Sequence, residues 1–480
     1  MAATRNEHYT LKPGSLMGLD LLQQGAVALG EVESNGIRVD SLYLKNTIVE
    51  TRNRIKSMVE ELCDDEIGKA WIKRFEGNVN FQAREQLAEV LQMDLGIKLP
   101  KTDKGNDKTD VGVLFDIEHP FIQKYVRINQ LKKALSTYLI GINKEAVNGY
   151  LHPFFNLHRV ITYRSSSSDI NFQNIPARDA EISAFIRRAF VPRKGRSLIE
   201  TDYGGIEVCI SACYNQDPTL IAYILDPTKD MHRDMAAQCY MIPPKEVVKA
   251  TRTAAKSFWT FAQFYGDYFA PCARNLWKEM VKKKFKTVSG DSVKKILRAN
   301  GITELGEEDS YGSVPDGTFM AHLQQVEDHF WNTRFKVYQQ WKDDWYEQYL
   351  EQGWISTLTG FVCAGNFKRN QIINFPVQGS AFHCLLRSLV RLVKFHLKKA
   401  KMKTLIVGQI HDSIVADVPH EETEDYCALV QHVMVEELMA AWKWIIVPIK
   451  IEITKYDDHW GQKRVNIWNL KKQIWEDKDI

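Results

Sequence analysis

The spacing of apolar and polar residues changes character near residue 150. Residues 41–96 and 116–140 are rich in helix-forming residues and place apolar side chains every three or four positions. Later in the chain, SLIETDY (197–203) and TLIVGQIHDSIVADV (404–418) are runs of β-branched and apolar residues typical of buried strands. These strands lie far apart in sequence, with helical material between them. The pattern therefore predicts an α+β centre that carries helical appendages.

Two polar stretches interrupt this pattern. The segment KTDKGNDKTD (101–110) contains a glycine and no apolar anchor, which predicts a solvent-facing loop. Residues 281–318 are charged and punctuated by glycine and serine, which indicates an insertion or a mobile subdomain. Long helical patterns then follow at 316–351 and 376–397.

Composition limits the class of protein. A chain of 480 residues can bury a large core and divide into roughly two to four domains. A net charge of +3 does not by itself indicate a nucleic-acid binder, although basic residues cluster at 282–286 and 398–403. The eight cysteines show neither zinc-site spacing nor a disulfide framework. No apolar run approaches the ~20 residues that span a membrane, and the first residues carry no targeting signal, so we expect a cytoplasmic protein.

Two aspartates stand at predicted strand ends. Asp202 lies between SLIET and the helix-like segment GGIEVCISACY, and Asp412 lies between two apolar strands that look like a hairpin. An isolated aspartate in such a place is usually a turn or cap residue. If a short sheet brings the two carboxylates together, they repel each other unless a cation is bound. Magnesium binds a few carboxylates together with phosphate oxygens and water, so the pair suits a two-metal site for in-line displacement.

A third feature is TRTAAKSFWTFAQFYGDYF (251–269), in which cations precede interleaved aromatic residues. Arg252 and Lys256 are four residues apart and share one helix face. A cationic face beside aromatic rings suits a triphosphate whose base stacks on a ring. An amphipathic core helix with a basic solvent face explains the same composition equally well.

Taken together, these segments resemble the motifs of the family A DNA polymerases, the family of bacterial DNA polymerase I. DYGGIEV is similar to motif A, R-x3-K…F-x3-YG to motif B, and GQIHDSIV to motif C. Further matches in family order are E-x2-GI-x-VD at 33–40, STY at 136–138, SSSDINFQNIP at 166–176, IRRAF at 186–190 and NFPVQG at 374–379. The resemblance implies a right-hand polymerase with an antiparallel-sheet palm and a mostly helical thumb and fingers.

The resemblance also implies which residues carry out the chemistry. Asp202 and Asp412 would bind two Mg²⁺ ions, for which Mn²⁺ can substitute, and the Tyr203 carbonyl would be a further ligand. Lys256 would neutralise phosphate charge and could protonate the leaving pyrophosphate.

A second implied set binds the incoming nucleotide. Arg252 and His232 would grip the triphosphate, although a lone histidine after Asp-Met is usually a surface residue. Glu207 matches the family's sugar gate, where a carboxylate supported by a motif B aromatic fills the space that a ribose 2′-hydroxyl needs. A first-turn carboxylate favoured by the helix dipole explains the same residue, and the two interpretations are compatible. The implied nucleotide-binding residues are Arg252, His232, Glu207, Phe261, Tyr265 and Gly266.

A third implied set holds the primer–template. Asn374 and Gln378 are four residues apart and could reach the minor groove together, where correct base pairs present nearly the same acceptors. The STY residues and the 101–110 loop would contact the duplex backbone without sequence preference. The implied DNA-binding residues are Arg164, Asn374, Gln378, His411, Ser136, Thr137 and Tyr138.

The chain departs from the family pattern in motif C and near motif B. Ser413 stands where motif C usually continues with glutamate, so a third carboxylate is absent from that position. Asn370 stands where the family has an arginine, with Arg369 adjacent.

Motif B itself has one extra residue between Lys256 and Phe261. In a regular helix Phe261 and Tyr265 would project away from the cations. We therefore predict a π-bulge between Lys256 and Phe261, which would return the aromatic residues to the cationic face. The competing register is a straight helix with Thr260 and Phe264 in the two aromatic positions.

These inferences predict a domain order and a function. The expected parts are an N-terminal segment on the palm (1–40), the thumb (41–140), the first part of the palm (141–205), the fingers with an insertion near 281–318 (206–353), and the second part of the palm (354–480). We expect a monomeric enzyme that extends a primer–template with dNTPs. Because only about thirty residues precede Glu33, we expect no 3′–5′ exonuclease domain, and any exonuclease or processivity subunit to be separate.

Two other functions remain open from the sequence. A non-catalytic DNA-binding relative could keep the fold as a scaffold, although a scaffold has no need of Asp202, Asp412 and Lys256 together. A two-metal nuclease would use the aspartates but would not explain motif B.

Overall fold

The computed structural model describes residues 9–102, 105–115, 117–176 and 179–479. Its centre is a six-stranded sheet in the order β13-β12-β11-β6-β10-β9. Every neighbouring pair of strands in this sheet is antiparallel. Its strands are β6 (Arg196–Tyr203), β9 (Leu405–Ile410), β10 (Ser413–Pro419), β11 (Ile451–Tyr456), β12 (Arg464–Asn469) and β13 (Ile474–Asp479). The strand over 197–203 and the hairpin over 404–418 that the sequence predicts are confirmed.

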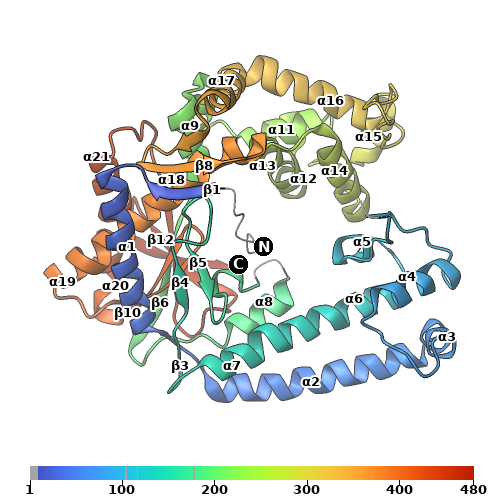
Figure 1. The fold of residues 1–480 in the computed structure, drawn as a ribbon, viewed down its shortest axis with the longest axis horizontal. Coiled ribbons are helices and arrows are strands. Elements are labelled where there is room, and N and C mark those ends of the chain that lie inside the picture. Colours follow the sequence, from blue (N-terminus) through green and yellow to red (C-terminus); the bar gives the residue numbers. More distant parts are fainter. Residues whose placement is uncertain (1–8, 103–104, 116, 177–178, 480) are drawn as a thin grey trace.

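Helices cover this sheet, and α18 (Arg369–Arg391) runs through the middle of the core. It contacts β10, α9 (Ile206–Asn215) and α1 (Leu16–Asn35), and α1 also contacts β9. A smaller sheet of β1 (Tyr9–Pro13), β8 (Phe361–Gly365) and β7 (Trp354–Ser356) lies beside them. Segments from both ends of the chain therefore pack around one core, as Figure 1 shows.

Helix α18 contains a proline, and a neighbouring side chain replaces the backbone hydrogen bond that the proline cannot make. Pro376 has no N–H, so the carbonyl of Ile372 loses its helical donor. The indole Nε1 of Trp345 donates to that carbonyl at 3.2 Å. The sequence predicts this helix to begin at 376, but it begins at Arg369, because Ile372, Ile373 and Phe375 are all buried in its first turns.

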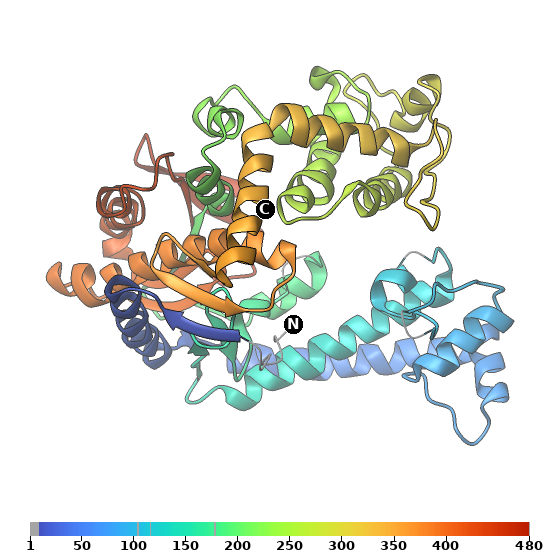
Figure 2. The ribbon, with the colours of Figure 1, turned by 45° about the horizontal axis from the view of Figure 1, so that its top comes forward.

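A long helical arm, residues 41–145, extends away from the sheet (Figure 2). Its helices are α2 (Ser41–Asp64), α3 (Glu66–Arg74), α4 (Arg84–Met93), α5 (Val111–Phe115), α6 (Pro120–Lys133), the π-helical turn η1 (Ala134–Ile140) and α7 (Gly141–Glu145). Helices α2 and α6 pack against each other along the arm. Trp71 at its outer end is fully buried, with its indole N–H donated to Gln86 at 3.0 Å.

A second group of helices, residues 218–352, forms a lobe above the arm in the view of Figure 1. Its elements are α10 (Pro218–Leu225), α11 (Met231–Cys239), η3 (Pro244–Glu246), α12 (Lys249–Ala255), η4 (Lys256–Thr260), α13 (Phe261–Phe264), α14 (Phe269–Lys283), α15 (Val293–Ala299), α16 (Phe319–His329), η5 (Phe330–Arg334) and α17 (Lys336–Gln352). The charged stretch 281–318 is packed into this lobe: Val293 and Leu297 are fully buried, and the Phe285 ring lies 5.7 Å from that of Tyr240.

Short elements connect these parts. They are β2 (Ile37–Arg38), β3 (Tyr150–Leu151), β4 (Phe154–Asn156), β5 (Ser166–Ser168), η2 (Phe172–Asn174), α8 (Ala180–Arg187), η6 (Leu392–His396), α19 (Leu397–Lys399), η7 (His420–Glu422), α20 (Thr423–Gln431), η8 (His432–Glu437) and α21 (Leu438–Ala441). The described part of the chain contains no helix that is both long and apolar enough to span a membrane. The fold is thus α+β and mostly helical around an antiparallel sheet, as the sequence predicts.

Candidate active site

Asp202 and Asp412 meet at one edge of the central sheet. Strand β10 pairs with β6 so that Ser413 lies opposite Asp202, and Asp412 is the last residue of the turn before β10. The Tyr203 N–H donates to the Asp412 carbonyl at 3.1 Å, which fixes the turn against β6. His411 makes this two-residue turn possible by adopting a φ of 47°, the left-handed conformation that such hairpin turns need. The sequence hypothesis that a sheet brings the two carboxylates together agrees with this register.

Burial and neighbouring carboxylates raise the pKa values of both aspartates. Burial raises the pKa of Asp202 to about 7, and the charges of Asp412, Glu200 and Glu452 add to the shift. Burial also raises the pKa of Asp412 to about 6, an effect that Arg164 opposes and Glu207 reinforces. The Arg164 Nη2 lies 3.9 Å from Asp412 Oδ1. One guanidinium does not neutralise so many carboxylates, so a further cation would be stabilised here.

The donor groups at this edge suit Mg²⁺ better than an ion whose ligands all come from protein side chains. The described part of the chain contains no cluster of three or more His, Cys, Asp or Glu side chains arranged to hold a metal. Two carboxylates at a strand edge leave most coordination positions to water and to phosphate oxygens, which is the manner in which Mg²⁺ is usually bound at phosphate-transfer sites. Asp202 is surrounded by enough protein to raise its pKa, yet part of its side chain remains accessible to solvent, so such a ligand can reach it.

Glu207 is held by two partners at the start of α9. The Tyr265 hydroxyl donates to its Oε2, and Arg164 Nη1 lies 3.3 Å from its Oε1. The Glu207 side chain is only 17% exposed, and its charge acts on Asp412, so this carboxylate is held near the metal-binding candidates. The pairing with Tyr265 joins motifs A and B, whereas the contacts of Arg164 are not encoded in any local sequence pattern.

The backbone between Lys256 and Phe261 forms a π-helical turn, as predicted. The Phe261 N–H donates to the carbonyl of Lys256, five residues earlier. The Lys256 ammonium consequently lies 5.4 Å from the centre of the Phe261 ring, on the same side of the helix. The competing straight register is wrong: Thr260 is fully buried, and the Phe264 ring packs in the core 5.4 Å from that of Tyr338.

Arg252 and His232 flank the same surface. The Phe261 ring meets the His232 ring edge-on at 5.6 Å, and Arg252 Nε donates to the Asp230 carboxylate at 2.6 Å. Burial and the charges of Arg252 and Lys256 lower the pKa of His232 to about 4, so its imidazole is neutral near pH 7. The buried Nδ1 of His232 has no hydrogen-bond partner within the described residues. Two cations and a neutral imidazole thus face the side of η4 that carries Phe261.

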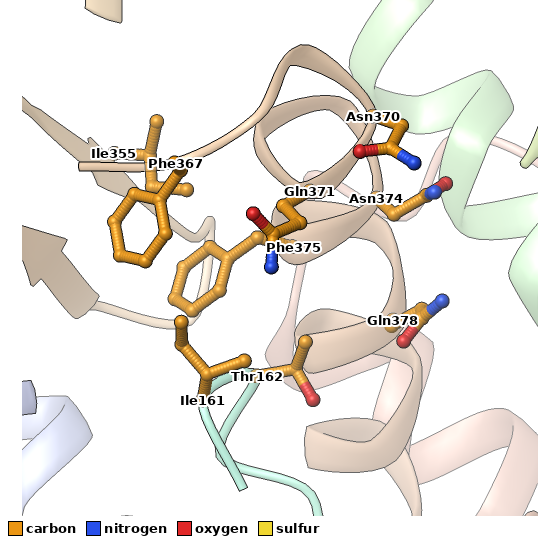
Figure 3. Close-up of a pocket in the computed structure, with 9 residues that line it drawn as sticks. All are labelled: Ile161, Thr162, Ile355, Phe367, Asn370, Gln371, Asn374, Phe375 and Gln378. Carbon is orange, nitrogen blue, oxygen red and sulfur yellow. The ribbon is translucent and has the colours of Figure 1, made fainter. Parts of the chain in front are cut away.

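An amide-bearing stripe on α18 continues from this surface. Asn370, Asn374 and Gln378 follow one another at intervals of four residues and lie along one side of the helix in Figure 3. They help to line a pocket of about 210 Å³. The Asn374 side chain donates to the carbonyl of Tyr265 at 2.8 Å, so the stripe is attached to motif B. Gly266 next to it has a φ of 88°, and a Cβ there would lie 3.1 Å from Asn370 Cβ.

The residues expected to touch a duplex backbone are not equally displayed. Ser136 and Thr137 are exposed on η1. Tyr138 is only 7% exposed, and its hydroxyl donates to the Asn174 carbonyl at 2.6 Å. Tyr138 therefore anchors the base of the long arm instead of presenting its hydroxyl to solvent. Of the predicted 101–110 loop, residues 103 and 104 lie outside the described residues.

Two nearby polar residues could not be assigned a role from sequence motifs. Glu200 lies two residues before Asp202 on β6, and alternate residues of a strand point to the same face. This spacing is visible in the sequence and could have indicated that Glu200 lies near Asp202. Glu452 on β11 lies directly opposite Asp202, but no motif marks it. Arg369, which is adjacent to Asn370 in the chain, is paired with Asp343 on α17.

The chain belongs to DNA polymerase family A, whose sequence pattern matches residues 45–284 and 324–462. It is 27% identical over 448 residues to the "DNA polymerase I, thermostable" of Thermus thermophilus. The aligned region covers 90% of this chain and 46% of that relative. The chain is 26% identical over 430 residues to DNA polymerase I of Aquifex aeolicus, and the aligned region covers 88% of this chain and 64% of that relative. The chain thus spans about half the length of the thermostable relative.

A solved structure shares the fold. The POL domain of Pol1 from M. smegmatis, in complex with DNA primer-template and dNTP, superposes with a TM-score of 0.70 at 24% sequence identity. The match covers 93% of this chain and 70% of that chain.

Proposed function

We propose that this chain is a template-directed DNA polymerase, which adds dNTPs to a primer 3′-hydroxyl and releases pyrophosphate. The observation that carries the proposal is the meeting of Asp202 and Asp412 at one sheet edge, where burial raises the pKa of both carboxyls and the charge of Asp412 adds to the shift at Asp202. Family membership and the cationic, aromatic face of η4 support the same conclusion.

The parts of the fold would then serve as a right hand. The long arm would be the thumb, the lobe over 218–352 the main part of the fingers, and the central sheet with α18 the palm. Exposed Ser136 and Thr137 would approach the duplex backbone, and Asn374 and Gln378 its minor groove. Contacts of these two kinds bind DNA without selecting a base sequence.

Each side chain of the proposed site has a task in nucleotidyl transfer. Two Mg²⁺ ions at Asp202 and Asp412 would activate the attacking oxygen and stabilise the leaving one. Lys256 and Arg252 would bind the negatively charged triphosphate and oppose the charge that develops on pyrophosphate. Neutral His232 would donate a hydrogen bond to the same phosphates. Fixing these groups before the nucleotide arrives converts binding energy into correct positioning.

Glu207 would select the sugar. With Tyr265 and Arg164 holding its carboxylate, it would occupy the space beside the C2′ position of the incoming nucleotide. A ribose hydroxyl there would have to displace a fixed carboxylate, which disfavours ribonucleotides.

Primer extension with purified protein, a primed template, dNTPs and Mg²⁺ tests the proposal. We expect robust extension by wild type, and none by Asp202→Ala or Asp412→Ala, because either change leaves one carboxylate to hold the ions. The proposal for a given residue would be wrong if its variant kept more than about a hundredth of the wild-type rate, since larger losses are usual for such groups. Duplex binding by both variants serves as the folding control.

The same experiment addresses the alternative of a non-catalytic DNA-binding relative. If the chain were such a protein, the wild type would bind the primed template but would not extend it under any metal condition. Extension by wild type that disappears in both aspartate variants would exclude it.

A further inference from the structure

A carboxylate behind the two aspartates is held by three side chains. Glu200 Oε2 accepts hydrogen bonds from the Trp460 indole at 3.0 Å and from the Tyr456 hydroxyl at 3.3 Å. Its Oε1 accepts from the Ser413 hydroxyl at 3.1 Å. Trp460 and Tyr456 are 2% and 6% exposed, so they form a rigid support. A carboxylate that accepts hydrogen bonds from three side chains is fixed in one position.

Ser413 connects Glu200 to the turn that carries Asp412. Ser413 follows Asp412 directly, lies opposite Asp202 across the sheet and is 3% exposed. Its Oγ is also 3.1 Å from the Ile410 carbonyl at the other end of the turn. The single proton of this hydroxyl lies between the Glu200 carboxylate and the Ile410 carbonyl, which places Glu200 against the two-residue turn in which His411 adopts its left-handed φ.

We propose that Glu200 is a positioning residue for the metal-binding carboxylates: through Ser413 it fixes the turn that carries Asp412, and its charge strengthens cation binding at Asp202. This inference rests on the proposed function. It also accounts for the serine in motif C, because the missing third carboxylate is supplied from the neighbouring strand. Both oxygens of Glu200 already accept hydrogen bonds, so it acts behind the ligands and is not itself one.

The two contributions of Glu200 can be separated by substitution. Glu200→Gln keeps the size of the side chain and its capacity to bond with Ser413, but removes the charge. Ser413→Ala keeps the charge but removes the link to the turn. Glu476 on β13 offers a matched control, because it is a glutamate of the same sheet whose partners, Asn469 and Lys472, are remote from the site.

Binding of Mn²⁺ by the full chain, followed by electron paramagnetic resonance of the free ion, provides a readout independent of activity. We expect Glu200→Gln to weaken Mn²⁺ binding about tenfold, as losses behind metal ligands commonly do. We expect Ser413→Ala to weaken it by a smaller factor and Glu476→Gln to leave it unchanged. Melting temperatures should agree within a few degrees among the variants, which would exclude a merely structural role.

Primer extension as a function of Mg²⁺ concentration gives a second readout. The half-saturating Mg²⁺ concentration of Glu200→Gln should rise by about the same factor, whereas the rate at saturating Mg²⁺ should fall much less. The exchange variant Glu200→Ser/Ser413→Glu should bind Mn²⁺ more tightly than Glu200→Ser alone, because it restores a third carboxylate.

The outcomes distinguish this inference from the proposed function. If wild type neither binds Mn²⁺ nor extends a primer, the proposed function fails. If wild type does both and Glu200→Gln and Ser413→Ala match it in Mn²⁺ affinity and Mg²⁺ dependence, only the role of Glu200 is refuted. If Glu200→Gln is too unstable to purify, unchanged Mn²⁺ affinity in Ser413→Ala alone refutes it.

Discussion

Removing one residue from the π-helical turn should be tolerated, although a single deletion in an ordinary helix is usually destructive. In an α-helix, deleting a residue rotates everything beyond it by about 100° and shifts it by about 1.5 Å. The turn η4 already contains one residue more than an α-helical turn, since the Phe261 N–H bonds to the carbonyl five residues back. Deleting the exposed Ser257 would leave Phe261 four residues after Lys256 and restore a regular helix with both in place.

The expected change in the free energy of unfolding depends on which buried side chains each deletion would expose. Asn275, an exposed residue in the regular helix α14, is the matched control. Its deletion would rotate Leu276 and Met280, which are 0% and 1% exposed, out of the core. Each loss is comparable to a large-to-alanine truncation at about 2–5 kcal/mol, so the pair approaches the total stability of about 5–15 kcal/mol. Deleting Ser257 should change the free energy of unfolding by less than about 1 kcal/mol, because the lost side chain is exposed.

Thermal unfolding and primer extension of the two deletion variants provide the assay. We expect the variant without Ser257 to melt within about 3 °C of wild type and to extend primers within about tenfold of the wild-type rate. The variant without Asn275 should be unfolded or strongly destabilised. Comparable destabilisation by both deletions would refute the interpretation of η4 as a one-residue insertion into an otherwise regular helix.

Two further predictions concern the nucleotide site. Glu207→Ala should raise the ratio of ATP to dATP incorporation. Tyr265→Phe should raise this ratio by a smaller factor, because it removes only the hydroxyl that holds the Glu207 carboxylate. Equal ratios in wild type and Glu207→Ala would contradict the sugar gate. The pKa of His232 is lowered to about 4 in the folded protein, whereas an unfolded histidine binds a proton below about pH 6.5. The folded protein therefore loses stability relative to the unfolded chain as the pH falls from about 6.5 to about 4. The variant His232→Gln should therefore lose about 2 kcal/mol less than wild type between pH 7 and pH 5 in denaturant unfolding, and identical pH dependence would show that His232 titrates normally. His383, whose pKa burial lowers to about 3, should behave similarly when replaced and serves as a reference away from the site.

The sequence predicts those features of the fold that repeat over a short distance. The runs of β-branched residues in β6 and in the β9–β10 hairpin identify strands, and the one extra residue in motif B identifies the π turn. The start of α18 is misjudged because Pro376 resembles a first-turn proline, while the fact that Trp345 compensates for its missing N–H is visible only in three dimensions.

Contacts between distant segments account for most of what the sequence does not predict at the site. The pairings of Arg164 with Glu207 and of Glu200 with Ser413 join residues 43 and 213 positions apart, and neither leaves a periodic signal. The bond from the Tyr138 hydroxyl to the Asn174 carbonyl is a similar case, because nothing in the STY motif predicts it. Motif matching identifies residue types at a site, whereas the partners that orient those residues depend on tertiary packing.

The strand order of the central sheet has a consequence for biosynthesis. Strand β6 ends at Tyr203, but its two hydrogen-bonded neighbours, β10 and β11, end only at Pro419 and Tyr456. At about 5–20 residues per second, a ribosome needs roughly ten to fifty seconds to make the intervening chain. During that interval both edges of β6, with the apolar side chains of Leu198 and Ile199, lack their native partners, which makes the nascent chain a substrate for chaperones that shield unpaired strands.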